Sequence, residues 1–364
     1  MHEPDELPPA TVKTPGSVDR ATSVRMLRSS LRGLLVLSLV GLLVAPMIAD
    51  ANVLKTLTEF LTVLVLAWMW NLLVGYANIV TIGQHAFVGV GGYAFYGFSA
   101  AAGWHPAASL AMAAGVSLLI AVPVLSIVFR LRDTYLAVGT WVTAEVLMLF
   151  AGKLPGFGGG AGVSLPTHVA QAFGSGMLER YRNIYLITLA TALVALVGMV
   201  VLLRSLAGLG LAAMRDNEEA ADACGVNTKR LRALCFLCVA PFLGLMGALV
   251  ALQKLSISPT SSFSITDWTV FIVFVVVIGG IGSLEGPIVG ALVYFVLREA
   301  FATQGTWHLI CLGGIAIIVL LWDANGLWGA MRRWLGGDLI PLTHTPERGA
   351  PTDPVLSLTT TICK

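Results

Sequence analysis

Long apolar runs constrain the fold of this chain more than any other feature. Crossing a bilayer as an α-helix takes about 20 consecutive apolar residues, because a helix rises about 1.5 Å per residue. Only 12% of the residues are charged, which is about half the usual share of a soluble domain. We therefore expect an all-α polytopic membrane protein with about ten transmembrane or re-entrant helices. The ten apolar runs cover residues 31–49, 54–76, 84–102, 107–129, 134–151, 184–203, 233–252, 267–283, 286–301 and 308–322.

Two of these runs break the simple pattern. Runs 84–102 and 286–301 are rich in glycine, and each follows a short polar break. Irregular backbone at membrane depth is tolerated where it is buried in protein or lines a water-filled cavity. These two runs are therefore expected either to span the membrane or to form re-entrant segments.

The distribution of basic residues predicts the orientation of the chain. With the N-terminus in the cytoplasm and ten spans, the inside segments hold 16 Lys and Arg residues and the outside segments hold 6. Cytoplasmic loops of membrane proteins carry such an excess. We expect both termini in the cytoplasm, residues 1–30 to form a disordered tail, residues 31–330 the transmembrane domain, and residues 331–364 a second tail.

The long polar interruption at residues 204–232 separates two apolar runs and must lie in water. Asp216 can cap a short helix, Glu219 follows three residues later as in a capping box, and Gly225 can close the helix in a left-handed conformation. Such a helix has about two turns and is too short to be stable alone in water. It must therefore lie against something, which is either its own bundle or another protein.

Small residues recur at a spacing of four in two stretches of the chain. Residues at this spacing share one helix face, where a missing side chain lets another helix approach closely. This predicts tight helix packing, and the glycine-rich breaks can alternatively line a substrate path. The packing residues are Gly282, Gly286 and Gly290 in one set and Ala240, Gly244 and Ala248 in the other.

Polar residues at membrane depth are the candidates for a translocation path, because a charge at a helix centre costs about 2.5–3.5 kcal/mol on insertion scales. Glu145 is the deepest acid, and it either accepts a structural hydrogen bond or lies on the path. Gln84 and His85 stand where a glycine-rich run begins, and a structural role is the alternative for both. The candidate path residues are Thr81, Gln84, His85, Glu145 and Ser283.

The sequence gives no reason to expect catalysis or a bound metal. Cys235 and Cys238 form a CxxC pair without a second pair or a nearby His, so we expect small buried side chains there. The phosphate-binding pattern GxxxxGK[ST] does not occur in the chain. The protein is therefore not expected to be an enzyme or to hydrolyse ATP itself.

The polar loop resembles the EAA loop of ABC importer permeases. The resemblance rests on Glu219-Ala220-Ala221 followed by Gly225. In that family the loop lies in a groove of a cytoplasmic ATPase subunit. The resemblance implies that Asp216, Glu219, Ala220, Ala221 and Gly225 transmit motion from the ATPase and do not touch substrate.

A longer resemblance runs from Asn71 to Trp322. Its segments are similar, in order and spacing, to the branched-chain amino acid importer permeases and specifically to their LivM-type subunit. They read NLLVGY…IGQHAFVGVGGY, LRDTYLAVGTW, GGGAGVSLP, MRDNEEAADACGVN and ISPTSSFS…VVIGGIGSLEGPIVGA. Because the segments are collinear, they are more specific together than any one motif. The chain departs from the family at Asp323–Leu327, where a Pro-Gly-Leu ending is common.

The resemblance implies an importer permease in the inner membrane of a bacterium or archaeon, surrounded by lipid. It implies a separate P-loop ATPase that binds ATP and Mg²⁺, a LivH-like second permease and an extracytoplasmic solute-binding protein, and no nucleic acid. Branched-chain amino acids are the family default, while related importers carry urea and short amides. The rival from another class is a secondary transporter or channel, for which Glu145 is the one modest argument.

Overall fold

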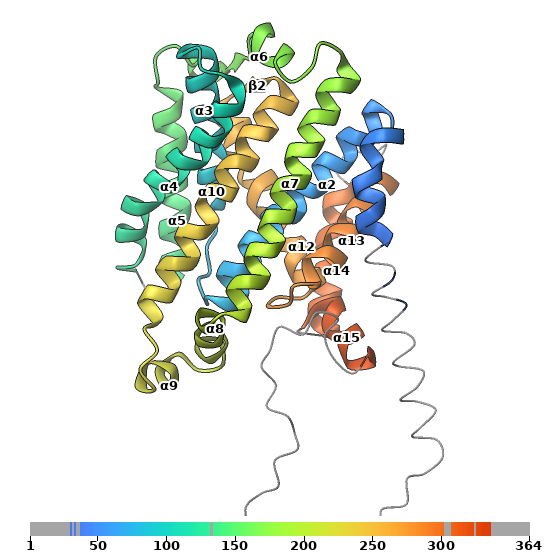
Figure 1. Cartoon of the computed structure of the whole chain (residues 1–364). Coiled ribbons are helices and arrows are strands. Elements are labelled where there is room, and N and C mark those ends of the chain that lie inside the picture. The colour runs from blue at the N-terminus through green and yellow to red at the C-terminus, as the bar shows by residue number, and fades with distance from the viewer. Residues whose placement is uncertain are drawn as a thin grey trace, which may run out of the picture.

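The described part of the chain is built almost entirely of helices (Figure 1). This computed structural model describes residues 30, 33, 37–131, 134–301, 307–323 and 325–335. The one strand pair, β1 (Val163–Ser164) with β2 (Ser256–Ile257), is antiparallel and two residues long on each side. The prediction of an all-α fold is therefore confirmed.

The apolar runs of the sequence are helical over most of their length. A helix at Leu37–Ile48 comes first and carries no label. The long helices are α2 (Ala51–Asn71), α3 (Gln84–Tyr96), α4 (Pro106–Val128), α5 (Thr134–Gly152), α7 (Met177–Arg204), α10 (Thr228–Lys254), α12 (Phe271–Gly279), α13 (Gly286–Ala300) and α14 (Trp307–Trp322). The short ones are α6 (Thr167–Gln171), α8 (Leu206–Asp216), α9 (Glu218–Ala223), α11 (Pro259–Ser262) and α15 (Gly326–Leu335).

Three π-helical turns extend these helices, at Leu72–Tyr76 after α2, Gly97–Ala101 after α3 and Thr266–Val270 before α12. Including such turns, five helices within the described residues are long and apolar enough to cross a membrane, and a sixth is possible if Gly313–Trp322 and Gly326–Leu335 form one bent span. The membrane location is thus confirmed. The number of ten spans and the orientation of the termini stay predictions.

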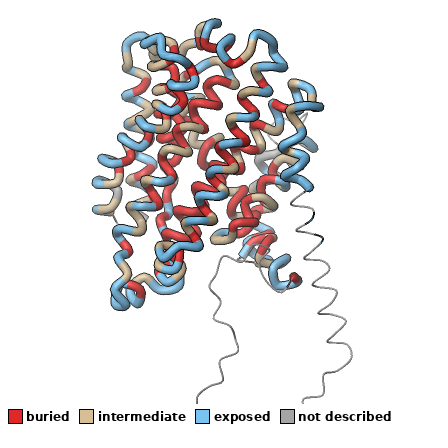
Figure 2. Tube along the Cα trace, viewed as in Figure 1, coloured by how far each residue is buried: buried red, intermediate tan, exposed pale blue. Residues whose placement is uncertain are grey.

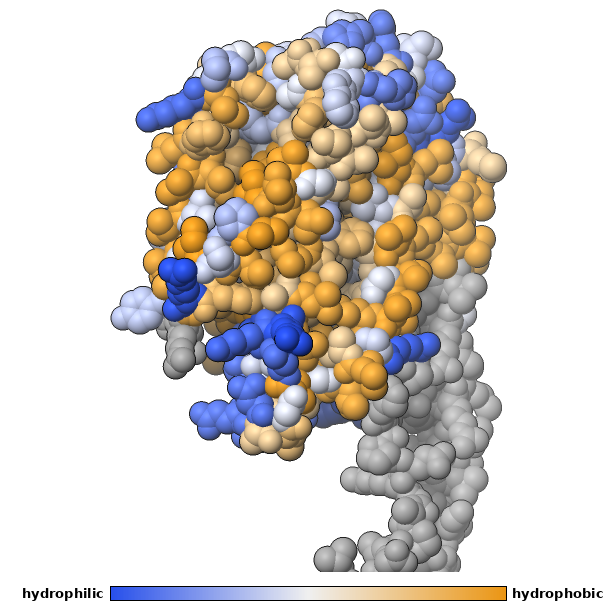
Figure 3. All heavy atoms as spheres, turned by 60° about the vertical axis from the view of Figure 1, so that its left-hand side comes forward, coloured by the Kyte–Doolittle hydropathy of each residue, from blue (hydrophilic) through white to orange (hydrophobic). Residues whose placement is uncertain are grey.

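The surface has the banded polarity of a protein that sits in a bilayer. Figure 3 shows apolar side chains across the middle of the visible face and hydrophilic side chains gathered toward both ends. Many large apolar side chains of the long helices are well exposed, including Leu119, Phe150 and Leu321 at 70%, 63% and 84%. Lipid tails can cover such side chains without cost, whereas water cannot.

Buried residues run through the inner part of the bundle (Figure 2), and α3 is buried on nearly every side. Every residue of α3 except Ala94 is buried. Glycines make this possible: a Cβ added at Gly91 would collide with the Gly244 carbonyl of α10, and one added at Gly247 would collide with the Val88 carbonyl of α3. The two backbones therefore lie directly against each other, with no side chain between them.

Gly244 serves two contacts at once, because a Cβ there would also collide with the Ser117 hydroxyl of α4. The flanking Ala240 and Ala248 are buried on α10. In the set that contains Gly286 and Gly290, Gly290 faces the Val275 carbonyl of α12 so closely that a methyl group would not fit. Five of the six small residues named from the sequence therefore lie at close helix contacts or in the core.

Gly282 differs from the prediction. It is not on the helix face shared by Gly286 and Gly290, because α13 begins only at Gly286. Gly282 has φ +75° and Gly280 has φ +125°, conformations that L side chains rarely adopt. These two glycines turn the chain between α12 and α13, so a spacing of four did not mean a shared helix here.

The predicted tails fall mostly outside the described residues. Of the segments 1–30 and 331–364, only residue 30 and residues 331–335 are described, and the latter are the end of α15.

Candidate functional site

The polar loop at residues 204–232, called the coupling loop below, forms two short helices at one end of the bundle. Figure 1 shows α8 and α9 below the long helices, at the end opposite α6 and β2. α8 is held against the bundle by Leu211 and Met214, which are 0% and 1% exposed. The loop is thus an ordered extension of the membrane domain.

The N-terminal cap of α9 is Asn217, which corrects the prediction of Asp216. The Asn217 side-chain oxygen accepts a hydrogen bond from the Ala220 N–H at 3.0 Å. Asp216 is the last residue of α8, and its side chain is 81% exposed. Asn217 has the extended backbone that a capping residue needs, while Asp216 is still helical. With the start one residue later, Glu219 occupies the second position of α9, not the third.

The C-terminal end of α9 is closed by Gly225, as the sequence predicts. Gly225 has φ +87°, its N–H donates to the Asp222 carbonyl at 2.9 Å, and the Val226 N–H donates to the Ala221 carbonyl at 3.0 Å. These two bonds form a Schellman motif, which satisfies carbonyls at the end of a helix. α9 has six residues, slightly fewer than the two turns expected.

The residues of the EAA-like pattern point in different directions. Ala221 is buried at 4% exposure and packs against the bundle. Glu219, Ala220 and Gly225 are exposed. One face of α9 therefore fixes the helix on its own protein and leaves the other face open to a partner.

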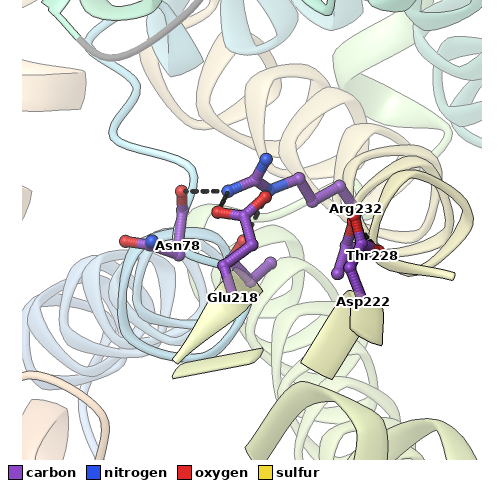
Figure 4. Close-up of polar contacts among 6 residues, drawn as sticks. Asn78, Glu218, Asp222, Thr228 and Arg232 are labelled. Carbon is purple, nitrogen blue, oxygen red and sulfur yellow. Dashed lines mark hydrogen bonds and ion pairs between the residues drawn. The ribbon is translucent and has the colours of Figure 1, made fainter. Parts of the chain in front are cut away.

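Arg232, the fifth residue of α10, joins α9 to the break between α2 and α3 (Figure 4). Its Nη2 lies 2.7 Å from the Glu218 carboxylate at the start of α9. Its Nε donates to the Ala77 carbonyl at 3.3 Å, and Nη2 donates to the Asn78 carbonyl at 3.5 Å. The nearby Asp222 carboxylate instead accepts from the Thr228 hydroxyl at 3.1 Å.

The break between α12 and α13, at residues 280–285, is held in a similar way. Asn71 accepts from the Gly282 N–H at 2.8 Å and donates to the Ser283 carbonyl at 2.7 Å. Arg215, on α8, donates to the Gly282 carbonyl at 3.3 Å. The Ser283 hydroxyl accepts from the Gly286 N–H at 3.1 Å, so it caps the start of α13.

Thr81, Gln84 and His85 lie together where the first break becomes α3, and all three are buried. The Thr81 carbonyl accepts from the Trp70 indole at 2.9 Å. The Gln84 amide donates to the Trp268 carbonyl, which ties α3 to the π-helical turn before α12. Among the described residues, the Gln84 Oε1 and His85 Nε2 atoms are buried without a hydrogen-bond partner.

The tautomer of His85 follows from its neighbours. Its Nδ1 lies 3.1 Å from the Ile82 carbonyl, which only accepts, and 3.0 Å from the Thr269 hydroxyl. The Thr269 hydroxyl itself donates to the same Ile82 carbonyl, at 3.1 Å. Nδ1 therefore carries the hydrogen in the neutral ring, and Nε2 is an acceptor. The two partnerless atoms at the start of α3 are both acceptors.

Glu145 makes no hydrogen bond to these three residues, but its charge lies close enough to act on His85. It is half-buried on α5, and its carboxylate accepts from the Trp141 indole one turn earlier, at 3.1 Å. α5 also reaches the start of α3 through the Thr140 hydroxyl, which accepts from the Ile82 N–H at 3.2 Å. Ser283 belongs to the second break, so the five predicted path residues form no single hydrogen-bonded cluster.

Sequence reasoning did not assign a role to Asn71, Arg215 or Arg232. Asn71 carries a signal that could have been read, because a fully buried amide near the end of an apolar run needs partners. The two arginines carry none, since basic residues are common in loops. Within the described residues, no three His, Cys, Asp or Glu side chains are placed to hold a metal ion.

Apolar helices, two broken helices against the core and a capped helical loop at one end define a polytopic membrane protein of the transporter class. The chain belongs to the family described as "Branched-chain amino acid transport system / permease component", whose model matches residues 52–320. The family resemblance found in the sequence is confirmed. Members are permease components, which agrees with the expectation that the chain is not an enzyme.

A curated relative gives a more distant likeness. The chain is 28% identical over 280 residues to the "High-affinity branched-chain amino acid transport system permease protein LivM" of Escherichia coli (strain K12). This match covers 70% of the present chain and 63% of the relative, so the chain spans less than two thirds of the length of that protein. No solved structure matches the chain.

Proposed function

We propose that this chain is the transmembrane permease subunit of an ABC importer that moves branched-chain amino acids, or a related small polar solute, into the cytoplasm. A separate ATPase would dock on the coupling loop and power the import. The observation that carries the proposal is α9: a six-residue helix, capped at both ends, fixed to its own bundle by buried Ala221 and half-buried Glu218, and exposed at its other four residues. Such a short helix is stable only because it is held, and its open face is free for a partner.

The partners follow from the family and from the chain's own chemistry. The chain has no phosphate-binding motif, so ATP and Mg²⁺ would bind to the ATPase. A LivH-like second permease and an extracytoplasmic solute-binding protein would complete the importer. The excess of basic residues supports a cytoplasmic location for the coupling loop and both termini, and the family supports a bacterial inner membrane.

The substrate path would pass the start of α3. Gln84 Oε1 and His85 Nε2 are buried acceptors without partners, which is costly unless a donor visits them. A solute with N–H groups fits this need, whether it is the ammonium group of an amino acid or the amide of urea. Glu145 would add a carboxylate to the path from α5. The urea and short-amide importers are therefore the second candidate.

The test is a pull-down of the detergent-solubilised protein from its native membrane. Wild-type protein should recover a P-loop ATPase and a second permease. Glu219→Lys and Gly225→Asp should lose the ATPase, because one reverses a charge on the open face of α9 and the other strains its cap. Glu299→Lys, an exposed acid on α13, makes the same charge change outside the loop and should recover both partners.

The opposite result points to another class. If the wild-type protein comes out alone and the loop variants change nothing, the coupling loop is ordinary cytoplasmic surface. A secondary transporter or channel would then be the better explanation.

A further inference from the structure

Two arginines extend from the coupling loop to the two helix breaks. Arg215 on α8 donates to the Gly282 carbonyl in the break before α13. Arg232, at the end of the loop, donates to the Ala77 carbonyl in the break before α3 and pairs with Glu218 on α9. Both arginines thus contact a backbone carbonyl of a break. Unlike a side-chain acceptor, a backbone carbonyl cannot leave the contact by changing its rotamer.

The two breaks are also joined to each other. Asn71, the last residue of α2, bonds both the Gly282 N–H and the Ser283 carbonyl. It directly precedes the π-helical turn Leu72–Tyr76, which ends at Ala77. The coupling loop, the end of α2 and the two breaks therefore form a closed set of polar contacts.

The geometry of Arg232 suits a connector better than a stabilising ion pair. Its side chain is 25% exposed and that of Glu218 is 35% exposed, so water and salt weaken the charge attraction. A guanidinium, however, offers five N–H donors in a fixed planar fork. One arginine can therefore hold a carboxylate on α9 and two carbonyls of the break at the same time, which a lysine cannot reproduce.

We propose that Arg232, with Arg215 as its counterpart, is a positioning residue that passes displacement of α8 and α9 to the breaks in front of α3 and α13. The inference rests on the proposed function. Ala77 and Asn78 lead within a few residues to Thr81, Gln84 and His85, so a shift of the first break moves the polar start of α3. Arg215 acts in the same way on the loop that holds Ser283.

The experiment measures how much solute is imported per ATP hydrolysed. The complex is purified from native membranes through a tag on this chain, placed in proteoliposomes with its binding protein, and given radiolabelled leucine and ATP. We compare wild type with Arg232→Gln, Arg232→Lys and the exchange Glu218→Arg/Arg232→Glu. Arg130→Gln is the matched control, because Arg130 is exposed and lies outside the coupling loop.

The expected result is uncoupling. Arg232→Gln should keep ATP hydrolysis within about twofold of wild type and lower uptake per ATP by about tenfold or more. The uptake per ATP of Arg232→Lys should lie between those of wild type and Arg232→Gln. The exchange variant restores the ion pair, but a glutamate at this position cannot donate to the Ala77 and Asn78 carbonyls. Its uptake should therefore stay low, whereas a purely structural ion pair would be rescued.

Two results would overturn the inference. Normal uptake per ATP in Arg232→Gln is one, and full rescue by the exchange variant is the other. If Arg232→Gln does not assemble, Arg232→Lys decides, since it keeps the charge and helix and loses only the fork. A wild-type complex that imports neither leucine nor urea when ATP is supplied would instead refute the proposed function, and the inference with it.

Discussion

Replacing Gly225 by Ala tests whether the shape of α9 matters for docking. The added Cβ would meet no atom within 4 Å, so crowding contributes nothing. The cost comes from the backbone alone, because φ is +87° and a left-handed conformation costs an L-residue about 1–2 kcal/mol. If the free loop relaxes and docking must restore the Schellman motif, the Kd for the ATPase should rise by about 5- to 30-fold.

The assay is a titration of the solubilised permease with its purified ATPase. Gly225→Asn should lose less affinity than Gly225→Ala, since Asn tolerates the left-handed region better than other side chains. Gly160→Ala is the matched control: Gly160 is exposed, has open space around it and has no positive φ, so its substitution should leave the Kd unchanged. Equal affinities for wild type, Gly225→Ala and Gly225→Asn would refute the idea that the cap presents α9 to a partner.

Three further substitutions address the path and the packing. Glu145→Gln should impair uptake while the complex still assembles, which uptake and co-purification measure together. Gly290→Ala should destabilise the protein by about 1–3 kcal/mol, because its methyl group would collide with the Val275 carbonyl; thermal unfolding in detergent measures this. Asn71→Ala should lower the unfolding temperature in the same assay, because the Gly282 N–H and the next carbonyl lose buried partners at about 1–3 kcal/mol each.

Each of these expectations has its contrary outcome. Normal uptake kinetics in Glu145→Gln would remove that residue from the path. For the packing variants, Gly198→Ala is the reference, since Gly198 lies in α7 with open space around it and should gain slightly in helix propensity. Unfolding temperatures equal to that reference would mean that the helices can move apart, or the break can find other partners, at no cost.

The long helices could be predicted from the sequence because lipid imposes one simple demand, a long apolar run, and five of the ten predicted runs lie in helices that meet it within the described residues. Gly225 was predictable for a similar reason, since few residues other than glycine take its conformation. The residue that caps the start of α9 was not predictable, because Asp216 and Asn217 are adjacent and both can cap a helix. Only the end of α8 decides between them, and propensity does not fix a helix end to one residue.

The contacts of the candidate site were beyond local patterns. Arg232 and Ala77 are 155 residues apart in the chain, and Asn71 and Gly282 are 211 apart. In each pair a side chain reaches a backbone group of a break beside the end of α2, and that arrangement depends on the whole bundle. Gly282 shows a different error. Its spacing of four from Gly286 suggested a shared helix face, but α13 begins only at Gly286.

The bare contact between α3 and α10 limits how this protein can change shape. Side chains between two helices act as adjustable spacers, because they can switch rotamers as the helices slide. Where carbonyls of one helix fill the space that a Cβ of the other would need, no spacer exists. α3 and α10 must therefore move as one rigid unit. Any opening toward either side of the membrane has to occur where this unit contacts the other helices.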